Sequence, residues 1–566
     1  MIIMTASYFH PALILIIGGL ILPLLSNTWR SILALLLPVA ALAAIWSVTD
    51  GSHWSISFLN YELDPFSVDK LSRLFITVFS FTAFAGVLYC YKQASSRELS
   101  AALIYAGSAI GVTLAGDLIT LFVFWEIMAL ASTLVVWSAR TDASWNAGMR
   151  YVILHLLGGV ILMGGIAAYS HETGSIVFTS MQLESLSTWL ILIGFLINAG
   201  APPLSAWIAD AYPESSFSGM VFLSAFTTKT AVYVLLRGYP GTEILIYIGL
   251  FMIFYGIVYA LLENDVRRIL AYSIINQIGF MLCGIGIGTE LALNGAAAQA
   301  FTHIIYKALL LMSTGSVLYM TGKRNCTDLG GLFRTMPLTC ICGIIGALAI
   351  SAFPWTSGFV SKSMLTQAAA DQQLQMVWLF LMSASAGAFV YVGIKFPWFV
   401  FFQKDSGLRP EEPPFNMRAA MILTAVLCIL IGIAPGLLYQ LLPYTVDYVP
   451  YTADHVLQQI HLLLFAGLAF FIMLPWIRNM LTSTIDFDWF YRKALYALWR
   501  FVIRVIVRIH EILSVQTQRT TVLIYRKSIR FYGLHGLFSR QMQTGTVALL
   551  AVLFLAAYLL FYMIHL

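Results

Sequence analysis

Five ionisable side chains lie inside long apolar stretches of the sequence, where an isolated charge is costly. They are Glu126, Lys229, His303, Lys307 and Lys362. Charged side chains at membrane depth usually face the interior of a helix bundle and mark an ion path or a proton relay. Carboxylates, amines and imidazoles each take up and release a proton, and histidine does so near neutral pH. These residue types at these places therefore predict proton transfer through a membrane.

Glu126 and Lys229 support this prediction most directly. Glu126 lies in LFVFWEIMALAST, about eight residues into its apolar run and so about 12 Å deep. Lys229 lies in AFTTKTAVY, with Thr227 and Thr228 just before it. Neither side chain has an evident route to the bilayer surface, so each must be paired, hydrated or neutral.

A third group lies in the apolar stretch 291–321, where Gln299, His303 and Lys307 are spaced by four residues. That spacing places all three on one helix face. A histidine beside a lysine on the same face suits a proton relay. Lys362 completes the set and follows an interruption in its own span.

Two further residues have alternative interpretations. His155 in YVILHLLGG connects the helix of Glu126 to the next one if it carries protons, but a single buried histidine is more often a packing group. Lys395 lies inside AFVYVGIKFPWFVFF. Its long stem favours a structural role, because it lets the ammonium reach the cytoplasmic interface.

The composition indicates the setting of these residues. The chain has 566 residues, of which 60% are hydrophobic and 10% charged, and its mean hydropathy is +0.85. Soluble proteins carry about 25% charged residues. We therefore predict an all-α, multi-pass protein of a cell inner (cytoplasmic) membrane, with about sixteen transmembrane helices.

The same composition excludes other classes. The net charge of +5 comes largely from the C-terminal third and indicates membrane orientation rather than nucleic-acid binding. The six cysteines show no metal-ligand spacing, and no glycine-rich dinucleotide motif follows a strand. No metal and no cofactor are therefore expected in this chain.

Basic residues fall on alternate connections between the predicted spans. The basic connections contain Arg97, Arg140, Arg267, Arg324 and Arg409, and the intervening ones are acidic or neutral. Positively charged connections stay in the cytoplasm. Both termini are therefore predicted to lie outside.

Two spans are interrupted. Pro202–Pro203 breaks the span 186–209, because proline lacks an N–H and its ring crowds the preceding turn. A second break, SAFPWTSGFVSKS at 351–363, has its proline 354 − 203 = 151 residues further on. Paired interrupted helices are typical of transporters built from an internal repeat.

The tail differs from this core. Residues 490–535 have a helical pattern with Arg500, Arg504 and Arg508 on one face. Burying these arginines in a bilayer would cost roughly 2.5–3.5 kcal/mol each, so we expect the segment to lie along the membrane surface. About 45 helical residues would extend nearly 70 Å and reach neighbouring subunits. The alternative is a basic cytoplasmic tail without a special contact.

The chain is thus divided into six predicted parts. They are N-terminal transmembrane helices (1–98), a first repeat (99–240), a second repeat (241–405), C-terminal core helices (406–480), a basic lateral amphipathic helix (481–542) and a final transmembrane helix (543–566).

Seven motifs, in order, resemble one known family. They are LFVFWEIMAL, PPLSAWIADAY, SAFTTKTAVYVLLR, ENDVRRILAYSIINQIGFM, AFTHIIYKALLLM, DLGGLFRTMP and FPWTSGFVSK. The family comprises subunits of Mrp antiporters and the antiporter-like subunits of respiratory complex I. The resemblance implies a fourteen-helix core with two five-helix repeats inverted in the membrane plane. It also implies a central chain of buried charged residues that links two half-channels.

The resemblance also implies individual roles. Glu126 looks like the key glutamate of the family, and His303 and Lys307 look like its central histidine–lysine pair. Lys362 looks like the lysine on the second broken helix. Lys229 resembles the lysine that many members carry after the first break.

Two positions depart from the family pattern. Asn198 stands where members usually have a lysine that pairs with the glutamate, and Gln299 stands where a histidine is common. Glu126 must therefore find its cation at Lys229 or on another subunit.

Three functions agree with these features. The first is a proton-translocating membrane subunit of a multi-subunit Mrp-type Na⁺(K⁺)/H⁺ antiporter, driven by the membrane potential. The second is a proton-pumping membrane subunit of a redox-driven complex, either NADH:quinone oxidoreductase or a membrane-bound hydrogenase. The third is an energy-coupling subunit for inorganic-carbon uptake.

The implied partners are the same in each case: other membrane subunits, protons, Na⁺ or K⁺, and the lipid bilayer. The sequence shows no redox or hydrolytic site. Any enzyme activity would therefore belong to a whole complex, such as NADH:quinone oxidoreductase.

Overall fold

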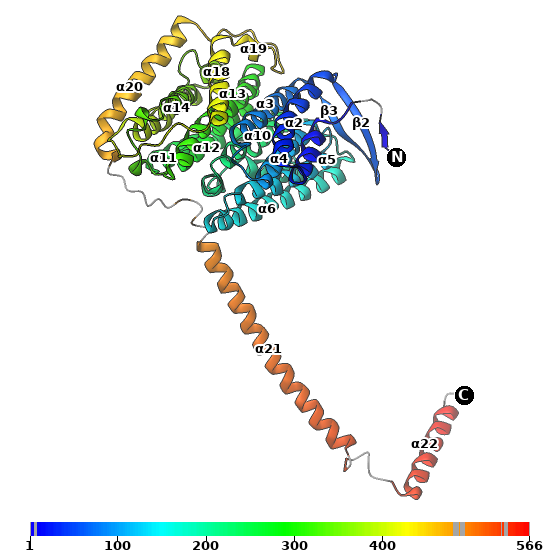
Figure 1. Ribbon diagram of the computed structural model, residues 1–566. Helices are drawn as coiled ribbons and strands as arrows, with labels where there is room; N and C mark the ends of the chain where they lie inside the picture. Colours follow the sequence, from blue (N-terminus) through cyan, green and yellow to red (C-terminus); the bar gives the residue numbers. More distant parts are fainter. Residues whose placement is uncertain are drawn as a thin grey trace. The chain divides into compact units, whose positions relative to one another are not determined.

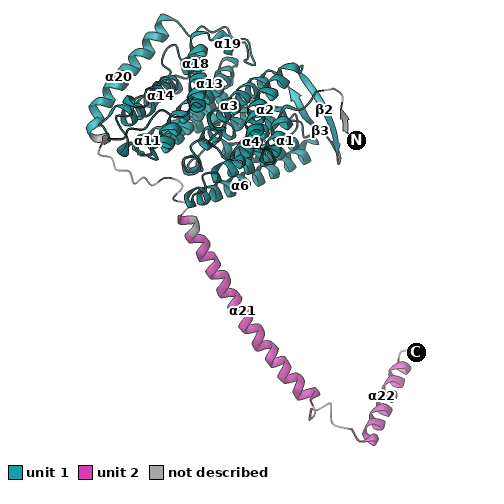
Figure 2. Ribbon diagram, viewed as in Figure 1, with its two compact units in different colours: residues 1–488 teal, residues 489–566 magenta. Residues whose placement is uncertain are grey.

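A computed structural model describes residues 2–4, 8–478, 486, 489, 493–533, 535–536 and 542–564. The chain forms two units, residues 1–488 and residues 489–566 (Figure 2). The predicted domain boundaries inside residues 1–480 remain predictions. The predicted start of the lateral segment at residue 481 lies outside the described residues, as do Phe487 and Asp488.

The first half of unit 1 contains ten helices among the described residues (Figure 1). They are α1 (Pro11–Ile21), α2 (Asn27–Ser47), α3 (Lys70–Cys90), α4 (Ser96–Leu114), α5 (Leu118–Trp137), α6 (Asp142–Thr173), α7 (Leu186–Ala199), α8 (Trp207–Ala211), α9 (Gly219–Ala225) and α10 (Thr227–Gly238). Short 3-10 turns, η1 (Leu22–Leu24) and η2 (Tyr212–Glu214), follow α1 and α8.

The second half of unit 1 begins with α11. Its helices are α11 (Ile244–Leu262), α12 (Val266–Ile287), α13 (Glu290–Thr321), α14 (Pro337–Ile350), α15 (Ser357–Asp371), α16 (Gln375–Ala388), α17 (Lys395–Pro397), α18 (Phe415–Ile433), α19 (Gly436–Tyr439) and α20 (Ala453–Arg478). Two 3-10 turns, η3 (Cys326–Asp328) and η4 (Leu332–Arg334), lie between α13 and α14. Two π-helical segments, η5 (Phe389–Ile394) and η6 (Trp398–Phe402), flank α17.

Hydropathy explains why these helices form a membrane protein. Twelve helices in the described part are long and apolar enough to cross a membrane, and three shorter apolar helices accompany them. The predicted multi-pass helical fold is confirmed. The number of sixteen spans stays a prediction, because this criterion reaches only the longer helices.

Three helices of unit 1 are interrupted, one more than predicted. The α7–α8 break contains Gly200 in the left-handed region and Pro202–Pro203, and the α14–α15 break contains Pro354. The third break separates α9 from α10 at Phe226. No proline or glycine marks this third position, so the sequence offered no local signal for it.

A small antiparallel sheet adds to the predicted all-helical architecture. Strands β1 (Ile2–Met4), β2 (Gly51–Phe58) and β3 (Tyr61–Val68) lie in the order β1-β2-β3. Phe58 pairs with Tyr61, so β2 and β3 form a hairpin with a two-residue turn (Figure 1). The connection predicted between the second and third spans is therefore folded.

Hydrogen bonds join several of the connections between helices. Val266 N donates to Arg324 O at 2.9 Å, which joins the connections before α12 and after α13. Elsewhere, Leu118 N donates to Ile176 O at 2.9 Å and Gly116 N to Asp64 O at 2.8 Å. Connections predicted to share one side of the membrane therefore contact one another.

Unit 2 contains α21 (Leu495–Tyr532) and α22 (Thr544–Ile564). Helix α21 has 38 residues. Three of its arginines, Arg500, Arg504 and Arg508, are spaced by four residues and so lie along one face of the helix. Helix α22 is long and apolar enough to span a membrane. A long basic helix before a last apolar helix agrees with the predicted tail.

Candidate functional site

Lys229 is positioned by the break between α9 and α10. The break leaves the carbonyl of Ser224 without its helical partner, and Lys229 Nζ donates to that oxygen at 2.8 Å. The same ammonium donates to Thr228 Oγ1 at 3.0 Å. The side chain is completely buried. The break thus provides polar ligands for an amine inside an apolar span.

The other side of this break is also satisfied by a specific contact. Thr227 N donates to Tyr105 OH at 2.9 Å, and Tyr105 OH contacts Thr227 Oγ1 at 2.6 Å. Tyr105 comes from α4. Since a neighbouring helix satisfies the freed N–H, the break is a built feature of the fold.

His303 and Lys307 lie on α13 and are both completely buried. Lys307 Nζ donates to Ser273 Oγ of α12. Both ring nitrogens of His303 lack a hydrogen-bond partner among the described residues. His303 lies within electrostatic range of Lys229, Lys307 and Lys362. The structure therefore brings together four of the five residues predicted from the sequence.

A network of neutral polar side chains lies beside His303. Gln299 Nε2 donates to Gln277 Oε1 and to Tyr306 OH, each at 2.9 Å. Ser361 Oγ donates to Gln299 Oε1 at 2.6 Å and contacts Thr302 Oγ1 at 2.9 Å. Gln299 therefore joins α12, α13 and α15, where the family often has a histidine.

Lys362 lies on α15, directly after Ser361, and is held at the second predicted break. Its Nζ donates to Ile350 O, the last residue of α14, at 2.7 Å. It also lies 4.6 Å from the ring centre of Phe280. As at Lys229, a helix break provides a main-chain carbonyl for a buried ammonium.

A small polar cavity of about 30 Å³ adjoins Lys362. Its lining includes the polar residues Lys362, Ser363, Thr366, Ser385, His455 and Gln459. His455 contacts Gln367 Oε1 at 3.2 Å and Tyr448 OH at 3.3 Å. His455 was not a predicted site residue, because the sequence places it at the start of α20, far from Lys362.

Glu126 lies apart from this chain of residues. It is half-buried on α5, and its Oε1 is buried without a hydrogen-bond partner. A Cβ at Gly159 of α6 would collide with this oxygen. Among the described residues, Glu126 forms no ion pair, so the expected pair with Lys229 is not formed in this structure.

His155 and Asn198, the weaker candidates of the first half, are both buried. His155 Nδ1 contacts Tyr151 O at 2.9 Å, and its ring stacks on that of Tyr151 at 3.9 Å. Its Nε2 and both amide atoms of Asn198 lack partners in the described part of the chain. The ring contact agrees with a packing role for His155. Substitution of Asn198 would break no side-chain hydrogen bond among the described residues.

Lys395 has a different environment from the other buried lysines. Its Nζ donates to the carbonyls of Ala260, Leu261 and Glu263 at 3.2, 2.8 and 2.6 Å. These are the last carbonyls of α11 and its cap. Three main-chain acceptors fill the three donors of an ammonium. These contacts favour a structural role for Lys395, with the ammonium buried at the end of α11 rather than extended to the membrane interface.

Glu98 is a buried carboxylate that the sequence did not reveal. It accepts hydrogen bonds from Ser216 Oγ at 2.5 Å and from Ser218 Oγ at 2.6 Å, and it is 4% exposed. It lies in the first turn of α4, where an acidic residue ordinarily interacts with the helix dipole in solvent. The sequence position therefore hid its burial.

Ion pairs hold the connection after the first break. Arg150 Nε and Nη2 donate to the two Asp210 carboxylate oxygens at 2.7 and 2.8 Å. Arg324 bridges Glu214 at 3.1 Å and Asp265 at 2.9 Å. Burial raises the pKa of Asp265, and the guanidinium of Arg324 opposes that rise. These pairs link the first repeat to the start of α12.

Several other buried polar atoms lack a protein partner in the described part of the chain. They include Ser205 Oγ, Tyr212 OH, Thr230 Oγ1, Ser357 Oγ and Tyr391 OH. Leaving a buried polar group without a hydrogen bond costs about 1–3 kcal/mol. Atoms of this kind are usually satisfied by internal water.

A family model described as "NADH:quinone oxidoreductase/Mrp antiporter, TM" matches residues 115–387. This range contains all five residues of the predicted path. Residues 115–387 form the membrane domain that this NADH:quinone oxidoreductase/Mrp antiporter model describes. The resemblance inferred from the motifs is therefore confirmed.

Named members of this family come from both transport and redox complexes. The chain is 29% identical over 334 residues to the D-type subunit of the Na(+)/H(+) antiporter of Alkalihalophilus pseudofirmus, covering 54% of this chain and 68% of that protein. It is 26% identical over 415 residues to hydrogenase-4 component B of Escherichia coli, covering 65% and 62%.

Solved structures of the family share the fold. The Mrp complex from Dietzia sp. DQ12-45-1b contains a chain that matches with a TM-score of 0.77 at 20% identity. The match covers 98% of this chain and 63% of that one. The chain thus spans less than two thirds of the length of some of its relatives.

Proposed function

We propose that this chain is the proton-translocating membrane subunit of a multi-subunit Mrp-type Na⁺(K⁺)/H⁺ antiporter in a cell inner membrane. One observation carries the proposal: Lys229, Lys307 and Lys362 are all buried and lie within electrostatic range of the buried His303. A protein that only anchored a complex in the lipid would not need several buried groups that bind protons.

The ligands of the three lysines support proton transfer. Lys229 and Lys362 are held by carbonyls at helix breaks, and Lys307 is held by a serine hydroxyl. A carbonyl or hydroxyl oxygen accepts from an ammonium without fixing its charge, as a carboxylate would. Each lysine can therefore alternate between its two protonation states.

Repulsion among the lysines gives the path its order. No carboxylate of the described residues lies within 4 Å of any of the three, so a proton on one lysine disfavours a proton on the next. His303, whose ring nitrogens have no partner within the described chain, lies between them. We infer that His303 passes protons between the two halves through internal water.

The cavity beside Lys362 supplies an outlet. Its volume of about 30 Å³ has room for a water molecule, and several polar side chains line it. His455 lies at the start of α20, on a connection that the charge pattern places outside. We propose that protons leave Lys362 through this cavity, past His455.

Glu126 serves the other end of the path. Its half-exposed position on α5 and its lack of a partner within the described chain favour a cation on a neighbouring subunit. This agrees with a protein that works only inside a complex. The exchanged cation and the identity of the neighbouring subunits belong to the proposal, not to the geometry of this chain.

A second candidate is the redox-driven pump subunit. It is favoured by the match to hydrogenase-4 component B, which covers 65% of the chain. In that case the same buried residues would carry protons, and electron transfer in other subunits would drive them.

The experiment measures proton movement by the whole complex in everted membrane vesicles with a pH-sensitive dye. Addition of Na⁺ or K⁺ should dissipate a preformed pH gradient, and Lys307→Ala should abolish that response. Lys323→Ala, an exposed lysine after α13, is the matched control and should behave as wild type. Cation-independent proton uptake that starts only with an electron donor would favour the redox candidate. Normal cation response in Lys307→Ala would overturn the proposed path.

A further inference from the structure

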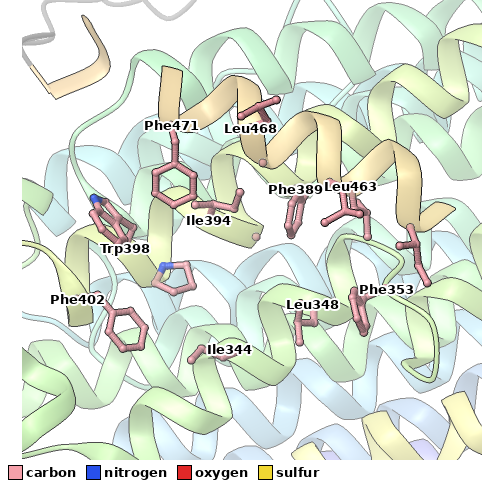
Figure 3. A pocket seen from close by; sticks show the side chains of 15 residues that line it. Ile344, Leu348, Phe353, Phe389, Ile394, Trp398, Phe402, Leu463, Leu468 and Phe471 are labelled. Carbon is pink, nitrogen blue, oxygen red and sulfur yellow. The ribbon is translucent and has the colours of Figure 1, made fainter. Parts of the chain in front are cut away.

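An apolar groove lies between α14, the η5–η6 segment and α20 (Figure 3). We propose that this groove binds one acyl chain of a phospholipid, with the headgroup at the end nearest Lys404. The inference concerns lipid binding and does not depend on the transport function.

The lining of the groove selects an apolar occupant. It is lined by apolar side chains from three elements (Figure 3). They include Ile344 and Leu348 of α14, Phe389 and Ile394 of η5, and Leu463 and Leu468 of α20. Backbone at Gly393 and Gly467 widens it further. A Cβ at Gly467 would meet its nearest atoms, on Ile394 and Phe389, at 3.5 Å, so a side chain added there would contact the lining without a clash. Water in such a space would lack polar partners.

The size of the groove fits one chain rather than a protein segment. Its volume is about 540 Å³. This volume lies within the range of sites that bind one small organic molecule. A transmembrane helix, about 10–12 Å across, would not enter. One acyl chain of ordinary length would fill the space.

The two ends of the groove differ in polarity. Trp398 lines one end, and its indole Nε1 is buried without a partner in the described part of the chain. Indole groups are enriched at the membrane interface, where they donate to polar groups. Lys404 lies two residues beyond Phe402 of the lining, is exposed, and forms no ion pair in the described chain. The phosphate of a phospholipid matches the exposed ammonium of Lys404.

The opposite end reaches the second helix break. Phe353, inside the α14–α15 break, lines the groove, and a Cβ at Gly393 would meet Ser351 Oγ at 2.7 Å. An acyl chain in the groove would therefore cover the lipid-facing side of the break that holds Lys362. The proposed acyl chain would therefore occupy a defined site, unlike the lipids that surround the protein as a whole.

The test uses the full-length chain in its native complex, in vesicles that contain phosphatidylglycerol with a diazirine near the end of one acyl chain. After photolysis, mass spectrometry should find label on Leu348, Phe353 and Leu463. As a reference, Val426, Leu430 and Ile433 are exposed apolar residues of α18. Compared with the exposed surface of α18, burial of two additional methylene groups favours occupancy of the groove by about tenfold. We therefore expect the labelling of the groove to exceed that of α18 by about tenfold or more.

Two variants on α20 separate a specific site from general lipid contact. Gly467→Phe places a ring in the groove and should lower the labelling of its lining by about tenfold. Ala469→Phe adds the same ring on an exposed position of α20 and should leave the labelling unchanged. Lys404→Glu should weaken labelling by the anionic lipid.

Equal labelling of the groove and of α18 in the wild-type complex would overturn the proposal, whether or not Gly467→Phe assembles. Unchanged labelling in an assembled Gly467→Phe complex would also overturn it. Displacement of the probe by an isoprenoid quinone, but not by unlabelled phosphatidylglycerol, would assign the groove to a different occupant and contradict the proposal.

Discussion

Lys229 and Lys395 are both buried lysines, but the atoms around their ammonium groups differ. Lys229 has one carbonyl and one threonine hydroxyl, and other proton-binding side chains lie within electrostatic range. Lys395 has three main-chain carbonyls at the end of α11. The first environment permits a change of charge, whereas the second uses the charge to close a helix end.

Lys395→Met should therefore reduce stability without blocking proton transport. Loss of hydrogen bonds from a charged group to three buried carbonyls should cost roughly 3 kcal/mol. The apparent melting temperature of the purified complex should fall, while cation-driven proton movement per assembled complex stays near wild type. Lys323→Met, at an exposed lysine after α13, is the control for stability. Lost transport with unchanged melting would return Lys395 to the proton path.

Lys229→Met should abolish transport in a complex that still assembles, because methionine fills the same space but holds no proton. Asn198→Ala is the companion variant. The Asn198 amide has no partner in the described chain, so its loss should leave at least about half of the activity. Dye-reported pH gradients in vesicles measure both. A fully active Lys229→Met complex would remove Lys229 from the path.

The sequence predicted the residues of the site better than their contacts. Hydropathy alone marked Lys229, His303, Lys307 and Lys362, because charges are rare in apolar spans. It could not show that Lys229 turns to a carbonyl rather than to Glu126, since that depends on the break at Phe226. Sites built from elements far apart in the chain, such as the cavity lined by Lys362 and His455, leave no local pattern.

At the scale of elements, the broken helices depend on neighbours that satisfy their ends. Glu412, from the connection before α18, accepts from Leu338 N at 2.6 Å and from Thr339 Oγ1 at 2.7 Å. Pro337 begins α14, so these are among its first donors. A carboxylate at a helix N-terminus also interacts favourably with the helix dipole. A distant loop thus fixes the start of the second broken helix.

Glu412→Ala should lower the stability of unit 1 by about 1–2 kcal/mol, as the loss of a helix cap does elsewhere. Thermal unfolding of the purified complex, followed by size-exclusion chromatography, measures the change. The adjacent Glu411 is exposed, so Glu411→Ala removes the same charge without the cap. Equal effects of the two substitutions would show that net charge, not capping, is responsible.

Helix positions followed from hydropathy, but two local structures did not. The apolar stretch that contains Lys229 forms two helices, α9 and α10, because Thr227 N donates to Tyr105 OH instead of to a carbonyl of the preceding turn. The hairpin β2–β3 lies in a connection that was predicted only as acidic. Both depend on contacts across the fold that composition and periodicity do not reveal.

At the scale of the whole chain, the proposed proton path depends on other subunits. Glu126 is half-exposed and has no cation within the described chain. The purified chain alone in liposomes should therefore show no cation/proton exchange, whereas the intact complex should. Exchange by the single chain, at a rate comparable to that of the complex, would show that the path is complete without partners.

The hairpin of β2 and β3 has a practical consequence for handling this protein. Its turn holds Leu59, which is 83% exposed and has a φ of 53°, followed by Asn60. The strand ladder closes at Phe58 and Tyr61, so residues added between them disturb no pairing. An epitope spliced in after Leu59 would give an affinity handle on a single face of the membrane. Intact assemblies could then be captured, and their orientation in vesicles sorted, with both chain ends left untouched.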